Sequence, residues 1–118
     1  MIKATCHCGA ISIEVPGLPA YMIDCNCSIC RRTRALWAFY AEDAVRIEGE
    51  PAHTEDYVWG EKSLRTVRCR SCGCVTHWKS LKPNDGGRMG VNMANFESDV
   101  VAALEVRRFD GADTWEYL

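Results

Sequence analysis

The sequence lacks any long hydrophobic run. Nowhere in its 118 residues is there a stretch approaching the roughly 18–20 consecutive apolar residues that span a bilayer. The opening residues also lack the apolar region of a secretory signal peptide. We therefore expect a cytoplasmic protein in a reducing compartment, with no membrane partner.

A surplus of basic residues is also absent. The formal net charge is −2 and the pI is about 5.9. Proteins that bind nucleic acid concentrate Lys and Arg on one surface, so we expect no nucleic-acid partner. The basic stretch 31–34 is too short to change this expectation.

Internal repeats, linkers and long amphipathic helical patterns are missing as well. The length predicts a single domain over 1–118. Short runs rich in β-branched and aromatic residues recur between turn formers, which predicts a mainly β, mainly antiparallel fold. The expected strands lie within 10–15, 20–23, 36–40, 44–47, 53–59, 63–68, 75–78 and 106–109, with turns at 16–17, 49–51, 59–60, 83–87 and 110–111. Single helical turns are expected around 28–32 and 93–101.

Cysteine is the residue type that stands out: there are eight, in three local groups. In a reducing compartment clustered thiols bind metal more often than they form disulfides. Disulfides or simply buried thiols are the alternative.

The first and third groups together predict a closed zinc site. Cys69 and Cys72 form a C-x-x-C knuckle followed by Gly73, which supplies two thiolates. A structural zinc site needs four ligands, and Cys6 and Cys8 are the natural complement across a sheet.

The middle group, Cys25, Cys27 and Cys30, offers three thiolates within six residues. Three protein ligands leave one coordination position open, and an open position distinguishes catalytic zinc from structural zinc. The sequence thus predicts two zinc ions, one in a closed site and one in an open site.

Cys74 and the histidines leave alternatives open. An extended strand would place Cys74 on the same face as Cys72, so two four-cysteine sites are conceivable, but we favour Cys74 as a small apolar strand residue. In an extended strand His7 would point away from Cys6 and Cys8, which disfavours ligation. His53 and His77 have no partner motif and are not assigned a catalytic role.

These motifs resemble the glutathione-dependent formaldehyde-activating enzyme family, which also includes centromere protein V type proteins. The likeness covers essentially the whole chain, apart from Cys74, which stands where Thr or Val is often found. It is carried by the following segments: Cys6-x-Cys8-Gly9, Cys25-x-Cys27-x-x-Cys30-Arg31-Arg32, Trp37-Ala38-Phe39-Tyr40, Cys69-x-x-Cys72-Gly73, Gly90-Val91-Asn92 and Phe109-Asp110-Gly111.

The resemblance implies a β-tent, in which antiparallel sheets meet at a zinc-held edge. It implies a structural zinc on Cys6, Cys8, Cys69 and Cys72, and a catalytic zinc on Cys25, Cys27 and Cys30. It also implies that formaldehyde and glutathione combine to S-hydroxymethylglutathione, which in reverse is a carbon-sulfur lyase reaction.

Glutathione carries two carboxylates, so its site should offer cations and amide donors near the open zinc. The candidates that follow or interrupt the middle group are Arg31, Arg32, Arg34, Asn26 and Ser28. A solvent-facing loop charge is the alternative for each arginine. Strand alternation would place Trp37 and Phe39 on one face, where they can wall a pocket, and Tyr40 on the other.

Two further functions compete with the enzyme. One is a non-catalytic module in which zinc only builds a scaffold for a protein partner. The other is a redox or metal-buffering protein that releases zinc on mild oxidation. Edge strands of a small sheet would also permit a homodimer.

Overall fold

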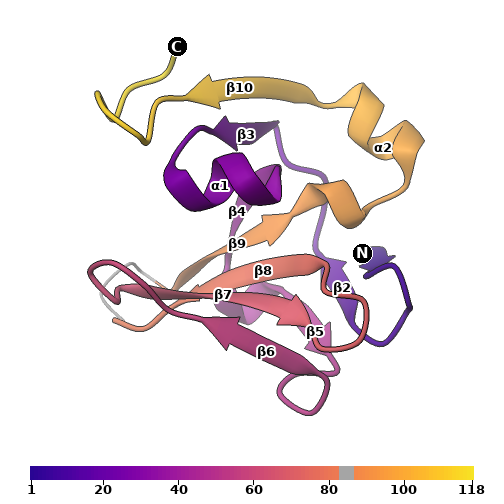
Figure 1. Ribbon diagram of the computed structural model, residues 1–118. Coiled ribbons are helices and arrows are strands. Elements are labelled where there is room, and N and C mark those ends of the chain that lie inside the picture. Colours follow the sequence, from indigo (N-terminus) through magenta and orange to yellow (C-terminus); the bar gives the residue numbers. More distant parts are fainter. Residues whose placement is uncertain (83–86) are drawn as a thin grey trace.

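The computed structural model describes residues 1–82 and 87–118, and its fold is mainly β (Figure 1). A three-stranded sheet has the order β1-β2-β5, and a seven-stranded sheet has the order β10-β3-β4-β9-β8-β7-β6. The strands are β1 Ile2–Thr5, β2 Ser12–Val15, β3 Tyr21–Cys25, β4 Trp37–Ala41, β5 Arg46–Glu48, β6 Thr54–Tyr57, β7 Leu64–Cys69, β8 Val75–Ser80, β9 Arg88–Asn92 and β10 Glu105–Phe109. The expectation of a mainly β protein is confirmed.

Within the described residues, helical structure is limited to short segments. Two α-helices, α1 Ser28–Thr33 and α2 Ser98–Ala103, accompany two 3₁₀ turns, Glu42–Ala44 and Met93–Asn95. The turn around 28–32 is confirmed as α1. The helical segment expected over 93–101 is divided in two, because Phe96 leaves the helical conformation (φ −81°, ψ 166°) and is buried in the core.

Most of the expected strands are present, with the following differences. β1 and β9 were not predicted, and the run 10–15 begins as a strand only at Ser12. The expectation of a mainly antiparallel fold is confirmed, and β10 with β3 forms a parallel pair among the described strands. The expected turn at 83–87 falls largely on residues 83–86, outside the part of the chain that the structure describes.

The two sheets pack on a shared apolar core. Ile13 and Val15 of β2 contribute from the small sheet, and Met22, Met89 and Val91 contribute from the large one. All five side chains are fully buried. Burial of this apolar area stabilises the packing of one sheet on the other.

Gly90 shows how the large sheet accommodates bulky aromatic residues. A Cβ atom at Gly90 would lie 1.9 Å from Nε1 of Trp78, so the absence of a side chain is what makes room for the indole. Gly90 pairs with both Trp78 and Phe39 on the neighbouring strands. The result is an aromatic surface on the face of the sheet toward α1.

Candidate metal centres and the surrounding site

The first cysteine cluster forms where two turns meet. Cys6 and Cys8 lie in the turn between β1 and β2, and Cys69 and Cys72 lie at the turn between β7 and β8. Their four Sγ atoms all lie within 4.8 Å of one another. The Sγ of Cys8 is 3.5 Å from that of Cys69 and 3.8 Å from that of Cys6.

Backbone N–H groups surround these sulfurs. Ile11 donates to the Sγ of Cys6 at 3.3 Å, and Ser71 donates to the Sγ of Cys69 at 3.4 Å. Burial alone would raise the pKa of the Cys72 thiol, but the backbone N–H groups of Cys74 and Cys8 outweigh it and lower that pKa to about 5. Four convergent sulfurs with amide donors around them fit a tetrahedral thiolate site for zinc.

The second cluster is built at the junction between β3 and α1. Cys25 ends β3, Cys27 precedes the first residue of α1, and Cys30 lies in the first turn of that helix. Their three Sγ atoms also lie within 4.8 Å of one another, and all three residues are half-buried. A metal ion held there would keep a side open to solvent.

The backbone N–H groups at the start of α1 lower the pKa of the Cys27 thiol. Burial opposes ionisation of its thiol, but the N–H groups of Cys30 and Ile29 contribute to a net lowering of its pKa. Burial raises the pKa of Cys30, while the indole N–H of Trp37 donates to its Sγ at 3.3 Å and acts in the opposite direction. Both contacts stabilise thiolates, the form that a metal ion binds.

A segment near the C-terminus forms one wall of the second cluster. A Cβ atom at Gly111 would lie 2.5 Å from the Sγ of Cys25 and 3.4 Å from the Cβ of Cys27. Gly111 therefore leaves space beside the sulfurs that any other residue would fill. The Trp115 ring also lies close to Gly111, 3.5 Å from where that Cβ would be.

Asn26 fixes this wall in place. Its side chain donates to Oδ1 of Asp110 and accepts from the backbone N–H of Ala112, both at 3.0 Å. Its own backbone N–H donates to the carbonyl of Phe109 at 3.1 Å. Asn26 thus ties the Cys25–Cys27 turn to the segment that carries Gly111.

Comparison with known proteins agrees with this arrangement. The family described as glutathione-dependent formaldehyde-activating enzyme matches residues 1–109. The chain belongs to this family. A crystal structure of a Rhodobacter sphaeroides protein is similar, with 31% sequence identity and a TM-score of 0.72, over 89% of this chain and 99% of that one.

Membership in the glutathione-dependent formaldehyde-activating family assigns a glutathione-related, formaldehyde-activating role at the level of the family. Two sets of cysteines predicted from the sequence are each brought together in space: Cys6, Cys8, Cys69 and Cys72, and Cys25, Cys27 and Cys30. Each set could hold a metal ion. Within residues 1–82 and 87–118, no helix is long and apolar enough to cross a membrane.

The residues predicted to bind glutathione separate into different environments. The side-chain amide of Asn26 forms hydrogen bonds within the protein, with Asp110 and Ala112. Ser28 is exposed at the start of α1. Arg31, Arg32 and Arg34 are exposed. Arg32 donates to the carbonyl of Ser28 at 2.8 Å, so it lies along the helix.

Helical periodicity distinguishes the two arginines of α1. An α-helix turns about 100° per residue, so residues four positions apart lie on the same face. Arg31 therefore lies on the face of Cys27, and Arg32 lies on the face of Ser28. Nothing in the described chain pairs with the Arg31 guanidinium. Arg31 therefore lies on the same side of α1 as Cys27 without an ion-pair partner among the described residues.

The assumption that His7 lies in an extended strand is wrong. Cys6 to Cys8 form a turn, because the chain reverses there and the backbone N–H of Cys6 donates to the carbonyl of Ile11. His7 is exposed and contributes no atom to the four-sulfur group. Cys74 also lies outside a strand, in the turn before β8, partly buried beside Cys72.

His77 is buried for a reason that the sequence did not reveal. Its Nε2 lies 3.2 Å from Oε1 of Glu50, and its Nδ1 lies 2.9 Å from the hydroxyl of Thr76. Lys79 and Arg65 also donate to Glu50, at 2.9 and 2.7 Å. This is an ion-pair network that joins the turn after β5 to β7 and β8, and it satisfies a buried histidine.

The aromatic run behaves as alternation predicts. Trp37 packs beside Cys25 and Cys30, and Phe39 makes an edge-to-face contact with Trp78 at 6.0 Å between ring centroids. Tyr40 packs against the shared core and donates to the carbonyl of Gly17 at 2.9 Å. Trp37 is thus the aromatic residue of the run that reaches the second cluster.

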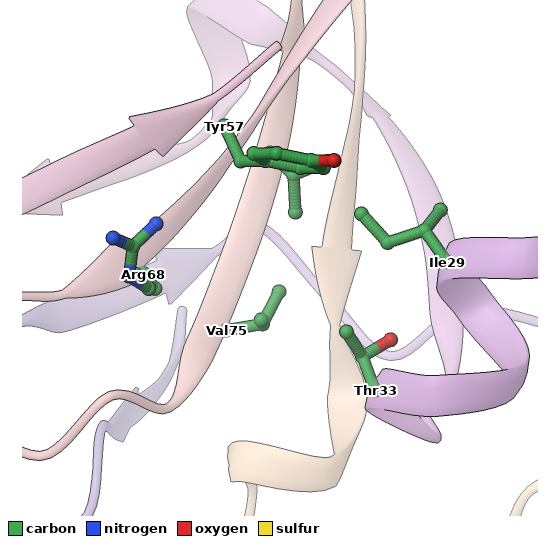
Figure 2. A pocket seen from close by; sticks show the side chains of 6 residues that line it. Ile29, Thr33, Tyr57, Arg68 and Val75 are labelled. Carbon is green, nitrogen blue, oxygen red and sulfur yellow. The ribbon is translucent and has the colours of Figure 1, made fainter. Parts of the chain in front are cut away.

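A small apolar cavity lies between α1 and the large sheet (Figure 2). Its volume is about 160 Å³, and it is lined by Ile29, Thr33, Tyr57, Thr66, Arg68 and Val75. Arg68 is already paired with Glu55 at 2.8 Å. Ile29 belongs to the helical turn between Cys27 and Cys30, so the cavity adjoins the second cluster through α1.

Proposed function

We propose that this chain is a zinc-dependent enzyme of the carbon-sulfur lyase type. Its substrate is the adduct of glutathione, or of another small thiol, with an aldehyde such as formaldehyde, and S-hydroxymethylglutathione is the prototype. The observation that carries the proposal is the three-thiol cluster of Cys25, Cys27 and Cys30, which is half-buried and has Gly111 at its side. We further propose that residues 1–118 form a single cytoplasmic domain.

The two clusters would hold metal ions with different roles. Cys6, Cys8, Cys69 and Cys72 would hold a structural zinc, since four thiolates complete a tetrahedron. Cys25, Cys27 and Cys30 would hold the second ion, whose chemistry is to lower the pKa of an added thiol and to orient it. Three thiolates against a divalent cation leave little Lewis acidity, so we favour thiolate delivery over activation of the carbonyl.

The chain's own residues prepare this site. Trp37 orients Cys30 through its indole N–H, and the first turn of α1 favours the thiolate form of Cys27. Gly111 keeps the space beside Cys25 clear. Asn26 holds Gly111 there through Asp110 and Ala112.

The reaction itself needs little more than positioning. The thiolate sulfur forms a bond to the carbonyl carbon, the C=O π bond breaks, and the oxygen takes up one proton to become a hydroxyl. The reverse reaction breaks the carbon–sulfur bond. Because formaldehyde is already a strong electrophile, orientation of the thiolate supplies the main advantage.

The surroundings suit a substrate with both charged and apolar parts. Arg31 can attract a glutathione carboxylate, and it lies on the side of α1 below Cys27. The cavity under Ile29 is apolar, and a cavity of about 150 Å³ is large enough to hold a benzene ring. An aldehyde larger than formaldehyde would place its carbon chain there.

Zinc counting with glutathione exchange tests the proposal. We expect protein purified under reducing conditions to carry two zinc ions per chain, and dialysis against millimolar glutathione to remove one. Magnetisation-exchange NMR with isotope-labelled formaldehyde then measures adduct formation. The Cys27→Ser and Cys30→Ser variants should lose the exchangeable zinc and the rate enhancement, while the matched Cys74→Ser variant keeps both.

Two results would overturn the enzyme. Adduct formation that stays at the wild-type rate after loss of the second zinc would show that this cluster is not the reacting site. Two zinc ions that both resist glutathione would show a closed second site, and the non-catalytic binding module would then be the better description.

A further inference from the structure

Cys74 is a fifth cysteine beside the first cluster. It is half-buried and packs together with Cys72 against Cys6, Ile11 and Cys69. Its sulfur is not among the four that lie within 4.8 Å of one another. Of the eight cysteines, all within the described chain, Cys74 alone belongs to neither metal-binding group.

The turn that follows β7 holds Cys74 next to Cys72. The backbone N–H of Cys69 donates to the carbonyl of Cys74, and that of Gly73 donates to the carbonyl of Cys69, both at 3.0 Å. Gly73 adopts a left-handed conformation (φ +77°) that folds the chain back between the two cysteines. As a result, Cys72 and Cys74 pack side by side at the edge of the first cluster.

This spacing is compatible with a covalent bond. Two peptide units keep the Cα atoms of Cys72 and Cys74 within about 7 Å, and a bent turn shortens the distance. Disulfides join Cα atoms about 4.4–6.8 Å apart. The two residues are half-buried, whereas Cys6 and Cys69 are almost completely buried. An oxidant can therefore reach Cys72 and Cys74 more easily than it reaches Cys6 or Cys69.

A resolving thiol has to be one that the metal does not hold. The four cysteines of the first cluster would all be bound to the ion, and Cys74 is the neighbouring cysteine whose sulfur is not among them. The Sγ of exposed Cys8 neighbours other members of the four-sulfur group, Cys6, Cys69 and Cys72. Cys74 also packs near Cys6, but Cys6 is almost completely buried, so Cys72 is the accessible ligand with an additional thiol beside it.

We propose that Cys74 makes the first cluster responsive to peroxides, through a disulfide between Cys72 and Cys74 that removes one metal ligand. The proposal rests on the metal assignment of the first cluster and not on the lyase activity. It concerns the site that would otherwise be purely structural. Its effect is to release the ion that joins the turn after β1 to the turn after β7.

The chemistry balances with a hydroperoxide as the oxidant. The Cys72 thiolate attacks the peroxide, takes one oxygen to become a sulfenic acid, and the remaining fragment leaves as an alcohol or water after taking up a proton. The Cys74 thiol then attacks the Cys72 sulfur, the S–S bond forms, and the oxygen leaves as water. The pair loses two electrons, which the peroxide accepts.

The test uses the zinc-loaded full chain and about a threefold molar excess of hydrogen peroxide, because a thiolate consumes two equivalents on the way to sulfinic acid. A colorimetric chelator follows the release of zinc, and peptide mass spectrometry maps the disulfides. We expect a Cys72–Cys74 linkage in the wild type and zinc rebinding after reduction with a dithiol. Cys74→Ser and the apolar Cys74→Val should release zinc from the first cluster about tenfold more slowly and should accumulate irreversible sulfinic acid at Cys72.

Several results would overturn the proposal. One is a disulfide between Cys8 and Cys69, or within Cys25, Cys27 and Cys30, in place of the Cys72–Cys74 linkage. Another is release that is equally fast and reversible in the Cys74 variants. If Cys74→Ser carries one zinc fewer before any peroxide is added, Cys74 is itself a ligand and the resolving role is wrong.

Discussion

The indole N–H of Trp37 donates to the Sγ of Cys30 at 3.3 Å, so an aromatic residue of the large sheet directly supports a candidate metal ligand. Hydrogen bonds to a ligating sulfur favour the thiolate and fix its direction. The pairing joins β4 to α1, two elements that approach each other around the second cluster.

Replacement of Trp37 should therefore weaken metal binding. We expect Trp37→Phe to lower the zinc affinity of the second cluster about tenfold, because the ring is kept while the N–H donor is lost. Chelator competition on the purified protein measures the affinity. Trp78→Phe is the matched control, since Trp78 packs in the same cluster of side chains without donating to a cysteine. Equal affinities in the two variants would contradict the role of the N–H group.

Gly111 offers a test by addition of a single methyl group. A Cβ there would lie 2.5 Å from the Sγ of Cys25, and the backbone φ lies outside the left-handed region, so the strain of Gly111→Ala is purely steric. We expect turnover of the thiol–aldehyde adduct to fall about 100-fold, as misplacement of a reacting group by an ångström commonly does. Steady-state kinetics and zinc content are the measurements.

The control for this substitution is Gly17→Ala. No atom lies within 4 Å of a Cβ at Gly17, and its φ is also outside the left-handed region. It should leave both turnover and zinc content at wild-type values. Wild-type kinetics in Gly111→Ala would show that this wall is not part of the site.

The two arginines of α1 should differ in their effect on substrate binding. We expect Arg31→Ala to raise the KM for a glutathione adduct about tenfold with little change in kcat, which corresponds to the loss of one charge-assisted contact. Arg32→Ala should change KM little, because Arg32 already donates to the carbonyl of Ser28. Equal KM values for the two variants, or a larger effect of Arg32→Ala, would contradict the assignment by helical face.

The Glu50 network should make stability depend on pH. Its hydrogen bond with His77, ahead of those with Lys79 and Arg65, holds the pKa of Glu50 well below its usual range despite burial. The ionised carboxylate then stabilises the folded state above about pH 4.5, the ordinary range of a glutamate in the unfolded chain. This contribution is lost as the pH falls toward the lower pKa of the folded state.

Glu50→Gln should lower the free energy of unfolding by about 3 kcal/mol at neutral pH, because it leaves the partly buried Arg65 and Lys79 without their counter-charge. Urea denaturation at several pH values measures the difference between the two proteins. That difference should shrink as the pH is lowered below about 4.5. A difference that is constant over pH would show that the charge of Glu50 is not what stabilises the network. Exposed Glu61→Gln serves as the control and should be neutral.

Local patterns in the sequence were enough to predict most strands and both cysteine groups. β1 was missed because its four residues, Ile2–Thr5, mix apolar and polar side chains at the very start of the numbering. β9 was missed because it contains Gly90, which weakens a strand pattern. The structure shows that Gly90 is required there by the ring of Trp78.

Contacts between segments that are distant in the sequence could not be predicted. Gly111 meets Cys25 across 86 positions, and spacing within a motif says nothing about such an approach. Asn26 is predicted to bind glutathione because it lies between two cysteines, whereas its hydrogen bonds to Asp110 and Ala112 could not be inferred from that spacing. The identity of Glu50 as the partner of His77 depended likewise on how β8 lies in the folded sheet.

Because the segment around Gly111 completes the second cluster, the two cysteine clusters become complete at different times during synthesis of the chain. All four sulfurs of the first cluster exist once the ribosome has added Cys72, so that cluster can gather its ion while the chain is still growing. The three sulfurs of the second cluster are made much earlier, yet their surroundings remain incomplete until residues 109–112 have been added and β10 has docked beside β3. A nascent chain would therefore complete the first cluster before the surroundings of the second.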